Sequence, residues 1–209
     1  SKDHATAQMV RHPPHHAAER ERFVEDLLAI MSVAEKAGQL VLLPIPEAGG
    51  DSEGAPLRAE MLQGRVGGLL GSGAADQLAA LQRLAVEETR LGIPLLMAYV
   101  PGRGTSVTMP APLALAATWS PQIVESAAQI VAGEARAHGM NWLMGPQVAL
   151  TSDTETEELA ESWGTSVHLA RALAAATVRG LQFEGQDGDG VLACLRTDAP
   201  GWIERRDPD

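Results

Sequence analysis

Short apolar runs alternate with longer segments of helical periodicity, and this alternation is the feature that most restricts the fold of the chain. The segments 74–90, 120–139 and 166–180 have the length and end signals of helices, each with a glycine at or near its end. The expected strands are 40–43, 66–70, 93–99, 141–150 and 190–195. Strands that alternate with helices in this way predict an α/β fold, a parallel sheet with helices packed on its faces.

Two helix starts and one loop can be placed by residue type. Ser32 and Glu35 have the spacing of a capping box, and Ser120 precedes a proline at the first helical turn, so each serine predicts a helix start. The run 40–43 has no polar residue, which is typical of a strand buried on both faces. Residues 47–56 are acidic and rich in glycine, and they predict a loop.

The first residues differ in composition from the rest of the chain. Residues 1–20 are polar and rich in histidine, so we expect a flexible N-terminal tail, followed by a single domain over 21–209 whose first helix starts near Phe23. The histidines in this tail that could hold a metal ion are His12, His15 and His16. No acidic or thiol side chain lies near them at ligand spacing, so we favour a linker and predict no metal site.

Composition excludes several classes of protein. The formal net charge is −11, whereas nucleic-acid binders gain most of their affinity by neutralising phosphates. No apolar run approaches the roughly 20 residues of a membrane span. Cys194 is the single cysteine, so the chain has no internal disulfide, and its place in an apolar strand predicts an inert core residue. We therefore expect no nucleic-acid partner, no membrane span and no cofactor.

The number of repeats leaves two architectures open. The sequence indicates about five strands and four connecting helices. A closed barrel of this type has about eight of each in roughly 250 residues. The chain is therefore either an open sheet or the first part of a barrel.

Several blocks of sequence occur in the order of a known family. They are Val24–Leu28, Glu35–Leu40, Gly64–Gly68, Leu91–Leu95, Pro112–Ala116, Trp119, Glu134–Arg136, Gly139–Trp142 and Arg179–Gln182. Over about residues 22–196, the chain resembles the N-terminal domain of glycoside hydrolase family 3, the β-glucosidase and β-N-acetylhexosaminidase family. The resemblance implies a TIM-like barrel that binds sugar at the carboxyl ends of its strands. It also implies retaining hydrolysis, in which an Asp attacks the anomeric carbon and an acidic or His residue protonates the leaving oxygen.

The turn after the third strand departs from the family pattern. Val100 stands where the family has an Asp that binds sugar hydroxyls, and Arg103 stands where it has a His. Valine cannot accept a hydrogen bond, so this sugar contact is absent. Arg103 lies between two glycines and could face an anion, although the turn lacks the full spacing of a phosphate loop.

The segments after the fourth and fifth strands depart as well. Asp153 matches the family, but Glu155 and Glu158 stand where the family has arginines. The acidic run could bind calcium, yet it lacks the glycine and ligand order of an EF-hand loop, so we favour a solvated surface. The family's Lys-His pair corresponds to Arg196 and Thr197, and threonine cannot replace an imidazole.

Four altered sites and the missing nucleophile segment predict a relative with no catalytic residue of its own. An incomplete TIM-like barrel of about five strands leaves an open sheet edge, so we expect an interaction or structural protein that self-associates or binds a protein partner. One alternative is a carbohydrate-binding module whose remnant pocket uses Arg103, Asp153 and Arg196. Another is a fragment or subunit of a β-glucosidase-type hydrolase acting on β-glycosides. The resemblance favours a periplasmic or secreted location.

Overall fold

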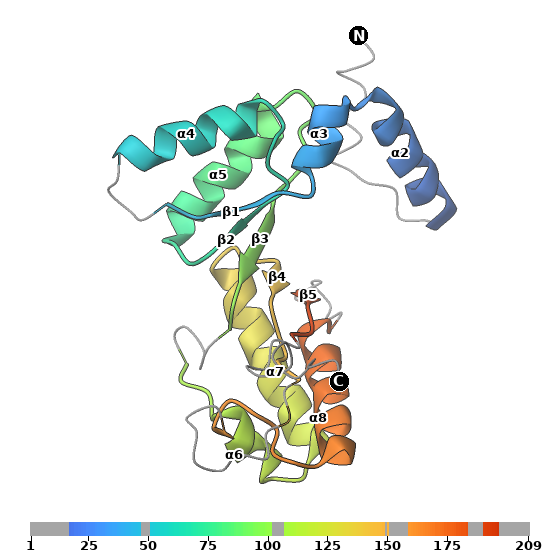
Figure 1. The fold of residues 1–209 in the computed structure, drawn as a ribbon, viewed down its shortest axis with the longest axis vertical. Helices are drawn as coiled ribbons and strands as arrows, with labels where there is room; N and C mark the ends of the chain where they lie inside the picture. Colours follow the sequence, from blue (N-terminus) through green and yellow to red (C-terminus); the bar gives the residue numbers. More distant parts are fainter. Residues whose placement is uncertain are drawn as a thin grey trace, which may run out of the picture. The chain divides into compact units, whose positions relative to one another are not determined.

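The computed structural model describes residues 17–46, 51–101, 107–148, 150, 159–183 and 190–196. The chain divides after Ala98 into a first unit, Ser1–Ala98, and a second unit, Tyr99–Asp209. Parallel strands and helices alternate along both units (Figure 1). This confirms the predicted α/β class.

The first unit contains a three-stranded parallel sheet in the order β1-β2-β3. Its strands are β1 (Leu42–Pro44), β2 (Gly68–Leu70) and β3 (Leu96–Tyr99), the last of which ends on the first residue of the second unit. Its helices are α2 (Ala17–Ile30), α3 (Val33–Gly38), α4 (Asp51–Leu62) and α5 (Ala75–Glu88). Leu69 of β2 lies opposite Met97 of β3, and both are almost fully buried together with Leu78 of α5. The central strand and α5 therefore form the core of this unit.

Several sequence predictions for the first unit need correction. Helix α2 starts at Ala17, earlier than expected, and α4 starts at Asp51, inside the predicted loop 47–56. In α4 the buried residues Leu57 and Met61 lie one turn apart, and their packing stabilises the helix despite the glycine and proline before them. The capping box at Ser32 is confirmed, because Ser32 and Glu35 each accept a hydrogen bond from the other's backbone N–H.

Strand β1 differs from its prediction in position and in burial. It begins at Leu42, two residues later than expected, and Leu40 is 89% exposed. Within the first unit, β1 pairs with β2 alone among the described strands, so it forms an edge of that sheet. The prediction of a strand buried on both faces is therefore wrong for this run.

The second unit contains three helices and a pair of parallel strands in its described part. The helices are α6 (Pro112–Ala116), α7 (Pro121–Ala137) and α8 (Val167–Leu181), and the strands are β4 (Trp142–Leu143) and β5 (Leu192–Ala193). Ser120 caps α7 as predicted, because its side chain accepts a hydrogen bond from the N–H of Ile123. Strand β4 is shorter than expected and ends before Pro146, which has no N–H to donate to a sheet.

Helices α7 and α8 pack closely against each other and supply most of the core of the second unit. Val124 of α7 and Leu173 of α8 are almost fully buried. Gly180 of α8 lies against the backbone of α7, where an added Cβ would come within 2.3 Å of the Glu125 carbonyl oxygen. No helix in the described ranges is both long and apolar enough to cross a membrane.

Candidate functional site

The carboxyl ends of the strands are the expected location of a site, because folds built from parallel strands and helices bind ligands there. The described residues that follow the strands are Ile45 and Pro46, Gly71–Ala74, Val100 and Pro101, Met144–Val148, and Cys194–Arg196. Among these described residues there is no carboxylate, and Arg196 is the single charged side chain. The strand ends described by the structure therefore carry no pair of acidic groups.

Arg196 is fixed by its backbone in the second unit. Its N–H donates to the Pro146 carbonyl (2.9 Å), and its own carbonyl accepts from the N–H of Val148 (2.8 Å). Met144, the first residue after β4, donates its N–H to the Tyr99 carbonyl at the end of β3 (2.8 Å). These bonds hold the segment after β4 between the ends of β3 and β5.

A cavity of about 140 Å³ opens beside these strand ends in the second unit. Helices α7 and α8 supply apolar walls, and Met109 and Met144 add two thioether side chains. Trp163 also lines the cavity, but it is buried, and its indole N–H donates to the Gln147 carbonyl (2.7 Å). Four further polar side chains lie along the lining, those of Gln147, Glu161, Thr177 and Arg196.

Of the three predicted sugar-binding residues, the structure describes one. Arg196 is half-buried and lines the cavity, whereas Arg103 and Asp153 lie outside the described residues. Val100 directly follows β3 and is 41% exposed, at the position where the family pattern requires a carboxylate. Cys194 is half-buried rather than a core residue, since it follows β5 near the surface.

Further predicted positions also lie outside the described residues. They are His12, His15, His16, Glu155, Glu158 and Thr197. Within the described ranges, no three His, Cys, Asp or Glu side chains gather into a group that could hold a metal ion.

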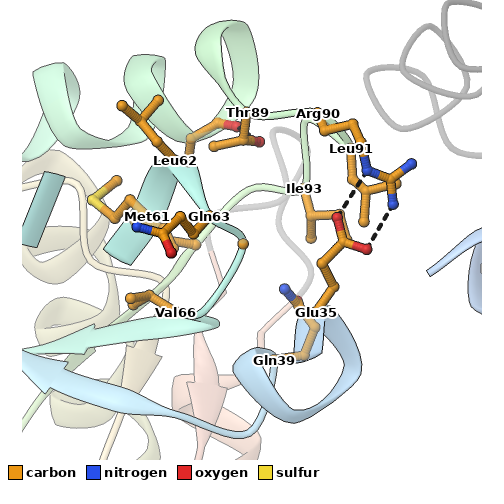
Figure 2. Close-up of a pocket in the computed structure, with 13 residues that line it drawn as sticks. Glu35, Gln39, Met61, Leu62, Gln63, Val66, Thr89, Arg90, Leu91 and Ile93 are labelled. Atoms are coloured by element: carbon orange, nitrogen blue, oxygen red, sulfur yellow. Dashed lines mark hydrogen bonds and ion pairs between the residues drawn. The ribbon is translucent and has the colours of Figure 1, made fainter. Parts of the chain in front are cut away.

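An ion pair in the first unit does not follow from any sequence pattern. Glu35 of α3 and Arg90, which follows α5, line a second cavity of about 140 Å³ (Figure 2). The Arg90 Nη2 atom lies 2.6 Å from Glu35 Oε2, and Arg90 Nε lies 2.9 Å from Glu35 Oε1. The capping box identified Glu35, but no spacing rule connects it with a residue 55 positions further on.

The environment of Glu35 makes it a structural carboxylate. The hydrogen bonds from Arg90, with further bonds from Ser32, lower its pKa from 4.5 to about 2 although burial opposes this shift. Both of its oxygens accept hydrogen bonds, and the group is ionised at neutral pH. Glu35 therefore has neither the proton of a general acid nor the free oxygen of a general base.

Parallel strands joined by helices, with a cavity beside the strand ends, are the arrangement found in domains of the TIM-barrel type. The model of the glycosyl hydrolase family 3 N terminal domain matches residues 32–196. The chain belongs to this family.

Relatives agree with this assignment. The periplasmic beta-glucosidase of Salmonella typhimurium is 29% identical over 163 residues, which are 78% of this chain and 21% of the relative. Beta-glucosidase C of Emericella nidulans is 28% identical, over 85% of this chain and 32% of its own length. The chain thus spans between about a fifth and a third of these relatives.

Solved structures show the same fold. A mutant beta-glucosidase from Listeria innocua in complex with laminaribiose superposes with a TM-score of 0.74 at 27% identity, over 84% of this chain and 26% of that one. A beta-N-acetylhexosaminidase from Beutenbergia cavernae has a TM-score of 0.65 at 18% identity, over 81% of this chain and 54% of that chain, and it supports the fold alone.

Proposed function

We propose that this chain is a non-catalytic member of glycoside hydrolase family 3 that works by interaction with another polypeptide. One observation carries the proposal: the described residues after the five strands contain no carboxylate, and Val100 directly follows β3. Retaining hydrolysis most often uses two carboxyl groups about 5–5.5 Å apart at the scissile bond, one of them the nucleophile. The described strand ends do not supply such a pair.

The exposed strand β5 is the surface that we assign to this interaction. Leu192 of β5 is 52% exposed, Leu195 lies close by and is also exposed, and Phe183 exposes a large apolar side chain after α8. In the first unit, β1 is an edge strand and Leu40 is exposed next to it. Edges with apolar neighbours favour pairing with another chain. The partner that we propose is a second copy, whose β1 pairs with β5 in parallel.

Light scattering coupled to size exclusion tests the association. We expect about twice the chain mass of 22.0 kDa. Leu192→Lys should shift the protein to the monomer, because a buried charge at the new pairing would be costly. Ile130→Lys on α7 is the matched control, since Ile130 is also 52% exposed and belongs to neither strand. A monomeric wild type, or equal effects of both substitutions, would overturn the self-association.

A hydrolysis assay tests the absence of catalysis. We expect no release of chromophore from chromogenic β-glucosides or β-N-acetylglucosaminides above the rate given by a mock purification. A turnover that follows the protein through purification would contradict a non-catalytic role. Release that appears only after a second polypeptide is added would favour the fragment or subunit interpretation, which is compatible with the share of its relatives that the chain spans.

Sugar binding without catalysis is the second candidate function. The observation that favours it is the likeness to the Listeria innocua enzyme, whose structures include complexes with laminaribiose and with glucose. Arg196, the remnant residue that the structure describes, lines the cavity of the second unit. A thermal shift with laminaribiose that disappears in Arg196→Ala would support this function. No shift with either sugar would count against it.

A further inference from the structure

The apolar cavity of the second unit has a chemistry that the proposed association through strand edges does not use. We propose that it is a binding site for a small, neutral aromatic molecule of about the size of phenol. This inference is independent of the strand-edge pairing, because the cavity lies among α7, α8 and the segment after β4.

One face of α7 forms the main wall. Val124, Ala127 and Val131 follow one another at helical spacing and all line the cavity. Leu181 of α8 and Leu115 of α6 contribute from the other elements. The wall is built on two helices that pack tightly against each other, so its shape is held by the core of the unit.

The volume of the cavity and the types of side chain that line it together indicate the class of ligand. An apolar cavity of roughly 150 Å³ in another protein stays dry and takes up benzene, and the volume here is about 140 Å³. Met109 and Met144 place two polarisable sulfurs in the lining, and thioethers make favourable contacts with aromatic rings. An aromatic ring therefore suits this cavity better than a polar ligand does.

The polar part of the lining suits one hydrogen-bonding substituent without net charge. Glu161 and Arg196 carry opposite charges, and Gln147 can donate or accept. A sugar would instead place several hydroxyl groups against apolar walls, where each unpaired hydroxyl is costly. Trp163 also lines the cavity, and its indole N–H is already bonded to the Gln147 carbonyl, so that donor is not left for a sugar hydroxyl.

The test is ligand-observed NMR on the full chain with phenol as the probe. We expect a dissociation constant on the order of 1 mM, as suits a ligand of so few atoms. Ala127→Leu adds volume inside the cavity and should weaken binding roughly tenfold or more. Ala137→Leu is the matched control, since Ala137 is exposed at the end of the same helix and does not line the cavity. It should leave binding unchanged.

Val131→Leu is a second substitution that adds volume inside the cavity, and it replaces Ala127→Leu in the test if that variant does not fold. No phenol binding by the wild type, or equal binding by the filled variants and the Ala137→Leu control, would overturn the proposal. Glucose at the same concentration serves as the competing probe. Saturable glucose binding that the filling substitutions abolish, with no binding of phenol, would also overturn it and would assign the cavity to sugar.

Discussion

Arg90 binds the carboxylate of Glu35 with two nitrogen atoms, at 2.6 and 2.9 Å, across 55 residues of sequence. The same carboxylate accepts from the backbone N–H of Ser32 at the start of α3 (2.8 Å), and Arg90 also donates to the Ile30 carbonyl at the end of α2 (3.2 Å). One ion pair thus connects a helix cap with the segment after α5 inside the first unit. Bidentate pairs of this kind are stronger than single hydrogen bonds between neutral groups.

Replacement of Glu35 by glutamine should destabilise the protein. The amide removes the charge and turns one acceptor oxygen into a donor that faces Arg90, so we expect the free energy of unfolding to fall by about 1 to 3 kcal/mol at pH 7. Urea unfolding measures the change. Glu60→Gln is the control, because Glu60 pairs with Arg65 at 3.0 Å on the surface, where such pairs contribute about 0 to 1 kcal/mol. Equal losses in the two variants would contradict the structural role of Glu35.

The same pair predicts how stability depends on pH. In the folded chain the pKa of Glu35 is about 2, against 4.5 without the hydrogen bonds from Arg90 and Ser32. Because the folded value is the lower one, the contribution of Glu35 is fully present above pH 4.5 and is lost as the pH falls towards 2. The stability difference between wild type and Glu35→Gln should therefore shrink over this window. A difference that stays constant down to pH 2 would show that the charge of Glu35 is not the cause.

Two helical glycines should respond to alanine with opposite signs. At Gly180 a Cβ would lie 2.3 Å from the Glu125 carbonyl oxygen and 2.6 Å from the Ala128 Cβ, so Gly180→Ala must separate α7 from α8 and should cost about 1 to 3 kcal/mol. At Gly133, in the middle of α7, nothing lies within 4 Å of the added atom. Gly133→Ala should stabilise by about 0.5 to 1 kcal/mol, because alanine favours the helix. Thermal unfolding of both variants checks the pair, and a stabilised Gly180→Ala would refute the close helix contact.

Local patterns predicted much of the fold. Ser32 and Ser120 mark helix starts because the acceptor and the backbone N–H that it caps lie within three residues of each other. The sequence predicts a loop where helix α4 begins, because its glycine and proline content disfavours a helix. The helix is stabilised by the burial of Leu57 and Met61 against the rest of the unit, which depends on tertiary packing. Leu40 is exposed because it lies in the turn between α3 and β1, and its apolar type alone does not distinguish this turn from the strand that follows.

The candidate site was predictable only where the family pattern has a defined residue. The replacement at Val100 and the position of Arg196 after the last described strand follow from matched sequence blocks. The cavity of the second unit could not be predicted from the sequence. Its lining residues Met109, Val131 and Leu181 come from three separate segments and meet only in the folded unit. The Arg90–Glu35 pair was missed for the same reason, since tertiary packing brings the two residues together.

Trp119 offers a test of backbone strain between α6 and α7. It has φ +53° and is 72% exposed, so the left-handed conformation is not offset by burial of the indole ring. This conformation costs roughly 1 to 2 kcal/mol for a residue with a Cβ and little for glycine. Trp119→Gly should therefore be more stable than Trp119→Ala by about 1 kcal/mol, since both remove the ring and only glycine removes the strain. Chemical unfolding of the two variants measures this difference, and an alanine variant as stable as the glycine variant would mean that position 119 carries no strain.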